Sequence, residues 1–109
     1  MAKIDLADFV KYGKLFEVYG KLLSEDRQAL MNLYFNFNMT LAEISKEKNI
    51  SRQAVLDGIT KSCAKLDALE EVLSIALKKE NLQQKLNKLK EISSVEEIKI
   101  KVDEILGDL

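Results

Sequence analysis

No proline interrupts this chain of 109 residues, and only four residues are glycine. Proline and glycine are the strongest helix breakers, so little in the sequence stops a helix once it has begun. Apolar residues recur at spacings of three and four, which is the period of a helix and not of a strand. Aromatic residues make up 6% and tryptophan is absent, so Leu, Ile, Val and Ala must build the core. The sequence therefore predicts an all-α fold.

Two helices are expected in the first third of the chain. An apolar stripe runs over 6–19 and stops near Gly20. Ser24 is followed by two acidic residues, and this order favours a helix start, because Ser caps and acids interact well with the helix dipole. The stripe of this second helix fades over 36–38. Both helices present one apolar face for packing.

The second half of the chain offers few stop signals. The residues 52 to about 91 contain no proline, and no glycine after Gly58, and they predict one long fourth helix of roughly 60 Å. Its apolar stripe shifts phase, which indicates either a kink near Lys78–Asn81 or a change of packing partner. The pair Ser93-Ser94 interrupts the run, and Ser94 is expected to cap a last helix over 95–106 that ends at Gly107.

These elements together predict a helix-turn-helix bundle of about five helices with a long fourth helix and a helical C-terminal arm. We expect a helix-turn-helix domain over 1–65 and an arm over 66–109 that continues the fourth helix. Charge follows the same division, because 21–65 carries a net charge of +2 and 66–109 one of −3, by seven basic residues against five and then ten acidic ones. The middle of the chain therefore tolerates a polyanion better than the arm does.

The segment 40–60 is the most informative part of the chain. Thr40, with Glu43 three residues later, predicts a capping box that opens a short third helix, Leu41 to about Lys48. A three-residue turn follows, and Ser51 is placed to cap the fourth helix. Short helix, turn and capped helix are what a helix-turn-helix requires. The motif also needs a small residue where the helices cross, which is Ser45, and a residue at the turn that tolerates the αL conformation, which is Asn49. Apolar residues must hold the corner. The predicted motif core is therefore Ile44, Ser45, Asn49, Ile50, Val55 and Ile59.

The segment from Leu22 to about Leu73 resembles the YlxM family of small bacterial proteins, which are similar to region four of sigma factors. The resemblance rests on Leu30–Tyr34, Leu41–Ile44 and above all SRQAVLD at Ser51–Asp57. It implies a helix-turn-helix protein with a regulatory role, linked to the signal recognition particle pathway. The chain departs from the family pattern at Leu56, Gly58 and Thr60, where an aromatic residue, Asn and a basic residue are usual.

The leading hypothesis is a regulatory protein that binds double-stranded DNA through this motif. The recognition helix would then contact DNA through Ser51, Arg52, Gln53, Leu56, Asp57, Thr60 and Lys61. Arg suits guanine and Gln suits adenine in the major groove. Phosphates would be contacted by Thr40, Lys46, Lys48 and Lys65.

Each of these assignments has an alternative. Arg52 is also placed to pair with Glu43 or Glu47, and Asp57 is expected to pair with Lys61 at the i, i+4 spacing. The lysines are also what an ordinary solvated helix face carries. The rival hypothesis is an accessory factor that binds protein or RNA of the signal recognition particle or its GTPase, with the motif as a scaffold only.

The arm carries more apolar surface than a thin helical segment can bury alone, and this indicates a partner helix. The last helix folded back on the long one would cover part of it, and a homodimer would cover the rest. A two-fold dimer would also pair two recognition helices, as two DNA half-sites require. The expected dimer interface consists of Leu66, Leu69, Leu73, Leu82, Leu86 and Leu89.

Several classes of function find no support in the composition. The chain has no histidine and a single cysteine, so the usual metal ligands and the commonest general base are missing, and we expect no metal and no cofactor. Cys63 is expected to be a small buried or half-buried residue. The adjacent acids Glu70–Glu71 and Glu96–Glu97 do not face each other on a helix, so we expect no enzyme. No apolar run approaches a membrane span or a signal peptide, which predicts a cytoplasmic protein without membrane insertion.

Overall fold

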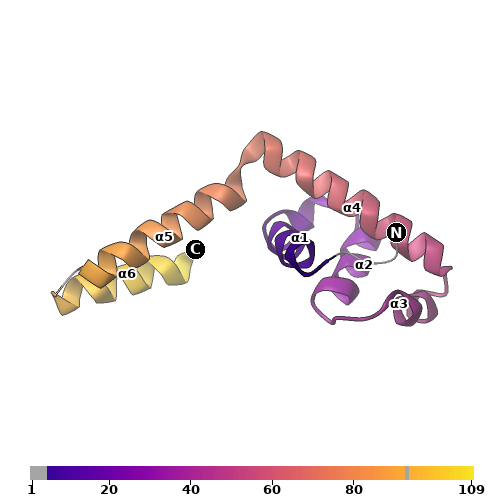
Figure 1. Cartoon of the computed structure of the whole chain (residues 1–109), viewed down its shortest axis with the longest axis horizontal. Coiled ribbons are helices and arrows are strands. Elements are labelled where there is room, and N and C mark those ends of the chain that lie inside the picture. Colours follow the sequence, from indigo (N-terminus) through magenta and orange to yellow (C-terminus); the bar gives the residue numbers. More distant parts are fainter. Residues whose placement is uncertain (1–4, 93) are drawn as a thin grey trace. The chain divides into compact units, whose positions relative to one another are not determined.

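The structure is a computed structural model that describes residues 5–92 and 94–109. All regular elements among these residues are helical, as predicted: six α-helices and one 3-10 helix, η1 (Figure 1). In chain order they are α1 (Leu6–Tyr19), η1 (Gly20–Leu22), α2 (Glu25–Phe35), α3 (Leu41–Lys48), α4 (Arg52–Leu73), α5 (Ile75–Ile92) and α6 (Glu96–Asp108). None of the described helices is long and apolar enough to cross a membrane.

The prediction of one long fourth helix is wrong, because this stretch of the chain forms two helices, α4 and α5. Ser74 has a φ of 53°, in the left-handed region, and a residue in that conformation cannot continue a right-handed helix. A new helix begins directly after it, with the Lys78 amide donating to the Ser74 carbonyl at 3.0 Å. The phase shift of the apolar stripe was a valid signal, but the break precedes the segment Lys78–Asn81 to which we assigned it.

The chain forms two compact units, and the boundary between them lies between Leu73 and Ser74. The sequence predicts this boundary after residue 65, eight positions earlier. We call residues up to Leu73 the N-terminal unit and Ser74–Leu109 the C-terminal unit. In the N-terminal unit α4 contacts α1, α2 and α3. Its buried apolar side chains are Leu15, Tyr19, Leu23, Leu30, Met31, Phe35, Ile44, Val55, Ile59, Cys63 and Leu66.

Leu66 corrects one expectation about the dimer interface. Its side chain is 0% exposed and belongs to the core of the N-terminal unit, so it has no surface to offer a second chain. The apolar spacing of α4 was recognised correctly, but the side chain packs against α4's own neighbours. Leu69 is half-buried and Leu73 is 40% exposed, so the burial of α4 weakens towards its end.

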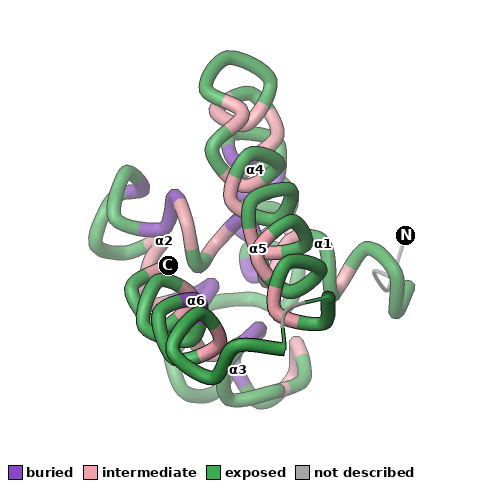
Figure 2. The backbone as a smooth tube through the Cα atoms, turned by 90° about the vertical axis from the view of Figure 1, so that its left-hand side faces the viewer, coloured by how far each residue is buried: buried purple, intermediate pink, exposed green. Residues whose placement is uncertain are grey.

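The C-terminal unit is a hairpin of α5 and α6, as expected from a last helix that folds back. α5 has no buried residue and α6 has one, Val102. Figure 2 shows most of the two helices in the colours of exposed and intermediate residues. The expected cap at Ser94 is wrong, because α6 begins at Glu96 with Val95 in the N-cap position and no side-chain cap. The helix also passes Gly107 and ends at Asp108. Ser93 lies outside the described residues.

Candidate nucleic-acid interface

The capping box at the start of α3 is confirmed. The Thr40 hydroxyl accepts from the Glu43 amide at 3.1 Å, and the Thr40 amide donates to the Glu43 carboxylate at 2.9 Å. The bond from the Thr40 backbone favours the charged carboxylate and lowers the pKa of Glu43. This reciprocal pair satisfies two amides that the first turn of a helix leaves unpaired. Helix α3 therefore begins at a defined residue, and its first turn is fixed by side chains that the sequence places three residues apart.

The turn of the motif is confirmed as well. Asn49 adopts the left-handed conformation with φ 55° and ψ 48°, which ends α3. The Ser45 hydroxyl donates to the Ile50 carbonyl at 2.5 Å, and the Ile50 amide donates to the Ser45 carbonyl at 3.1 Å. The Ser51 hydroxyl accepts from the Ala54 amide at 3.0 Å and so caps α4. Ser45 thus does more than allow a close crossing, because it ties α3 to the turn through two hydrogen bonds.

The corner between the two helices is held by three of the four apolar residues predicted for it. Ile44, Val55 and Ile59 are at most 1% exposed. Ile50 is 41% exposed, so its expected place in the motif core is wrong. Its main-chain bonds to Ser45 position it in the turn, and its side chain is not needed to fill the corner. Figure 1 shows α3 next to the beginning of α4.

The predicted recognition residues lie on the surface of α4. Ser51, Arg52, Gln53, Asp57, Thr60 and Lys61 are exposed, and Leu56 is half-buried. Gln53, Asp57 and Thr60 follow the spacing of one helix face. The expected pair of Asp57 with Lys61 is absent from the described residues, because Asp57 instead accepts from the Gln53 amide nitrogen at 3.0 Å.

The basic side chains of the motif are unpaired in the described part of the chain. Arg52 forms no ion pair with Glu43 or Glu47 there, so this alternative is excluded for the structure. Lys46, Lys48, Lys61 and Lys65 are exposed and take part in none of the ion pairs of the described residues. The motif therefore presents five cationic groups to solvent.

Gly58 does not lie on the exposed face of α4. It is buried, and a Cβ atom built on it would lie 2.4 Å from Cδ2 of Leu30. Arg27 donates through Nη1 to the Gly58 carbonyl at 3.2 Å and to the Ser62 hydroxyl at 3.4 Å. Position 58 is thus where α2 and α4 approach closely.

Two tyrosines of α1 position the second half of α4, and no local signal in the sequence indicated them. The Tyr12 hydroxyl donates to Asp67 at 2.7 Å, and the Tyr19 hydroxyl donates to Glu70 at 2.5 Å. Lys11 lies 3.1 Å from the same Asp67 carboxylate. The hydrogen bonds to Asp67 raise the pKa of both Tyr12 and Lys11. These contacts hold the second half of α4 against α1, although they join residues more than fifty positions apart in sequence.

Cys63 is confirmed as a buried residue, 6% exposed. Burial disfavours the thiolate and raises the pKa of this thiol to about 12. At neutral pH the group is therefore protonated and a poor nucleophile. No group of three or more acidic or cysteine side chains able to hold a metal ion occurs within residues 5–92 and 94–109.

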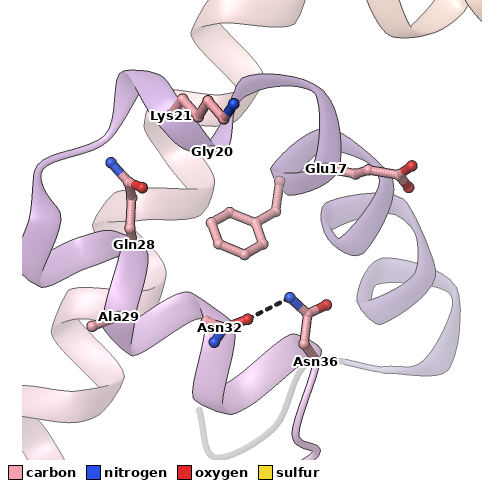
Figure 3. A pocket seen from close by; sticks show the side chains of 8 residues that line it. Glu17, Gly20, Lys21, Gln28, Ala29, Asn32 and Asn36 are labelled. Carbon is pink, nitrogen blue, oxygen red and sulfur yellow. Dashed lines mark hydrogen bonds between the residues drawn. The ribbon is translucent and has the colours of Figure 1, made fainter.

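A pocket of about 370 Å³ lies elsewhere in the N-terminal unit (Figure 3). It is lined by residues of α1, η1 and α2, among them Gln28, Asn32 and Asn36 along one face of α2. These amides are engaged within the chain: Asn36 donates to Asn32 at 2.6 Å, and Gln28 donates to the Leu23 carbonyl at 2.9 Å. No residue of the α3–α4 motif lines this pocket, so it is separate from the candidate interface.

The capped α3, the left-handed turn and the exposed start of α4 define the class: this is a helix-turn-helix protein. The chain belongs to the UPF0122 family, whose model, described as "Putative helix-turn-helix protein, YlxM / p13 like", matches residues 6–105. It is 34% identical to a UPF0122 protein of Fusobacterium nucleatum over 101 residues, 93% of this chain and 98% of that protein. It is 39% identical to UPF0122 protein YlxM of Bacillus subtilis over 80 residues, 73% of each chain. A UPF0122 protein of Bacillus cereus is 39% identical over 83 residues, 76% of each chain.

Proposed function

We propose that the α3–α4 motif binds double-stranded DNA and that the protein acts as a regulator through this binding. One observation carries the proposal: the first turn of α4, directly after the Ser51 cap, projects Arg52 and Gln53 into solvent. In helix-turn-helix proteins this turn is the part that enters the major groove. Arg52 would contact guanine and Gln53 adenine, which are the bases that their donor and acceptor groups match.

The unpaired cations around this turn support the same proposal. Lys46 and Lys48 lie in the last turn of α3, and Lys61 and Lys65 lie further along α4, all of them exposed. These four lysines supply at most four phosphate contacts, so the logarithm of affinity should fall with the logarithm of salt with a slope no steeper than about −3.6. The overall charge of −1 adds no further attraction to DNA. We therefore expect specific binding to depend on base contacts rather than on a strong general affinity.

Asp57 favours a second candidate function. Its carboxylate lies on the same helix face as Gln53 and holds the Gln53 amide in a hydrogen bond of 3.0 Å. A negative charge beside phosphates is unfavourable, whereas a protein surface with basic groups would accept it. Asp57 therefore supports the protein-binding form of the second candidate, an accessory factor of the signal recognition particle pathway whose motif binds a protein partner.

The test is fluorescence anisotropy of two labelled duplexes, one of random sequence and one selected by the full chain from a random-sequence pool, each titrated with the chain over a range of salt concentrations. Arg52→Ala with Gln53→Ala should weaken specific binding by about 1–3 kcal/mol for each bidentate pair of hydrogen bonds that it removes. The thermal midpoint should hardly move, because exposed substitutions usually stay within about 0.5 kcal/mol. Lys14→Ala is the matched control, since it removes one positive charge from α1, outside the motif, and should leave binding unchanged.

Asp57→Asn separates the two candidates. It removes one negative charge but keeps an oxygen that can accept from Gln53, so non-specific DNA affinity should rise. If the unmutated protein shows no salt-dependent binding to any duplex at low ionic strength, the DNA proposal fails. The motif is then the scaffold of the second candidate, and Asp57→Asn should weaken binding to that partner.

A further inference from the structure

The C-terminal unit is smaller than the domains that usually fold alone. It comprises Ser74–Leu109, which is 36 residues (109 − 73), and Val102 is the one buried apolar side chain within its described residues. Domains of fewer than about 40 residues usually need a disulfide, a metal or association with another chain. This unit contains no cysteine and no histidine. Association is the remaining source of stability.

The apolar surface for such an association is a groove along the hairpin. It has a volume of about 460 Å³ and is lined mostly by apolar side chains: Leu86, Leu89, Ile98, Ile100, Val102 and Ile105. Four of these remain substantially exposed in the single chain, Leu89 at 44%, Ile98 at 42%, Ile100 at 51% and Ile105 at 45%. A contiguous apolar groove of this kind marks an interaction surface.

The charges of the two helices indicate which partner covers it. α5 carries five lysines against two glutamates, a net charge of +3. α6 carries five acidic residues against two lysines, a net charge of −3. Within the chain this contrast already produces a pair, because Lys90 Nζ lies 2.7 Å from Asp103. A hairpin with one basic and one acidic helix is complementary to a copy of itself in which the order is reversed.

We propose that the groove of the α5–α6 hairpin binds the same groove of a second copy of this chain. A two-fold axis places α5 of each copy beside α6 of the other, which gives a four-helix bundle with basic and acidic helices alternating. Of the six residues expected from the sequence, this interface keeps Leu86 and Leu89 and omits Leu66, Leu69, Leu73 and Leu82. It adds three isoleucines of α6. It is independent of whether α4 binds DNA, because it requires no residue of the motif.

Sedimentation equilibrium of the full chain, without DNA, tests the proposal. The expected mass is twice 12.4 kDa at micromolar concentration. Leu89→Lys with Ile100→Lys places two charges in the groove and should raise the dimer dissociation constant by about thirtyfold or more. Leu77→Lys with Ile92→Lys is the matched control: it adds the same charge to exposed positions that do not line the groove, and the mass should stay that of the dimer. Circular dichroism, with the melting of the N-terminal unit, verifies that each variant is folded.

Salt tests the order of the helices. With α5 beside α6 of the other copy, unlike charges face each other, and dissociation should increase when salt rises from about 0.05 to 0.3 M. A dimer that tightens with salt would place like helices together and overturn this arrangement. A monomeric wild-type protein, or a dimer that the groove variant leaves intact, overturns the interface itself.

Discussion

The two units of this molecule carry the same kind of pattern and reach different degrees of burial. Their helices all repeat apolar residues at spacings of three and four, yet among the described residues the N-terminal unit buries eleven apolar side chains and the C-terminal unit one. The difference is the number of neighbours, since α4 contacts three helices and α5 contacts α6 alone within its unit. An amphipathic stripe therefore indicates that a helix has a face to bury, and the topology determines whether its own chain buries it.

The largest expected effect is on the stability of the N-terminal unit, which is the better packed of the two. Leu66→Ala removes a side chain that is 0% exposed, and the cavity it leaves should cost about 2–5 kcal/mol in the free energy of unfolding. Leu82→Ala is the counterpart in the C-terminal unit, where the side chain is 43% exposed, and it should cost well under half as much. Urea denaturation followed by circular dichroism measures both. Equal losses would mean that the two units are packed to the same degree.

Each unit contains a helical glycine, Gly58 in α4 and Gly107 in α6. Substitution by Ala should change the free energy of unfolding in opposite directions at the two positions. Gly58→Ala places a Cβ 2.4 Å from Leu30, which is buried and must change its packing, and we expect a loss of about 1–2 kcal/mol. Gly107→Ala meets no atom within 4 Å, so the better helix propensity of Ala should give a gain of at most about 1 kcal/mol. Thermal unfolding of both variants is the measurement. The control is Gly58→Ala combined with Leu30→Ala, which should cost less than the sum of the single changes.

The smallest effect concerns the link between α1 and α4. Hydrogen bonds to Asp67 raise the pKa of Tyr12 and of Lys11, so both groups hold their protons more tightly in the folded protein. Their stabilising contribution is present below the ordinary pKa values near 10 and is lost as pH rises through the raised ones. The thermal midpoint of the N-terminal unit should therefore decline above about pH 10. Asp67→Asn should flatten this decline, and an unchanged slope in that variant would contradict the assignment.

Local signals in the sequence were sufficient for the motif and insufficient for its surroundings. The pairs Thr40–Glu43 and Ser51–Ala54 act over three residues, so the sequence contains both partners side by side. The left-handed conformation of Asn49 could likewise be predicted, because asparagine tolerates that conformation at the end of a helix. The errors at Gly58 and Leu66 concern residues whose roles depend on distant partners. Gly58 is explained by Leu30 on another helix, and no spacing within α4 could have indicated it.

The helix break was missed for a different reason. Ser74 adopts a left-handed conformation that glycine or asparagine usually occupies, so its residue type carried no warning. Ser does compete locally for main-chain hydrogen bonds, which makes it a weak point in a helix, but many serines lie in helices undisturbed. The stop signals that placed the ends of α1 and α3 therefore did not give the position of the boundary between the two units.

Cys63 gives the N-terminal unit a built-in reporter. Its thiol is 6% exposed and its pKa is about 12, so an alkylating reagent at neutral pH has almost no thiolate to attack while the unit is closed. Alkylation then proceeds only through openings of the N-terminal unit, and its rate reports how often they occur. The chain has no other cysteine, so the alkylation rate does not report on the C-terminal hairpin. The rate of opening of the N-terminal unit can thus be measured without an introduced probe and without interference from the C-terminal unit.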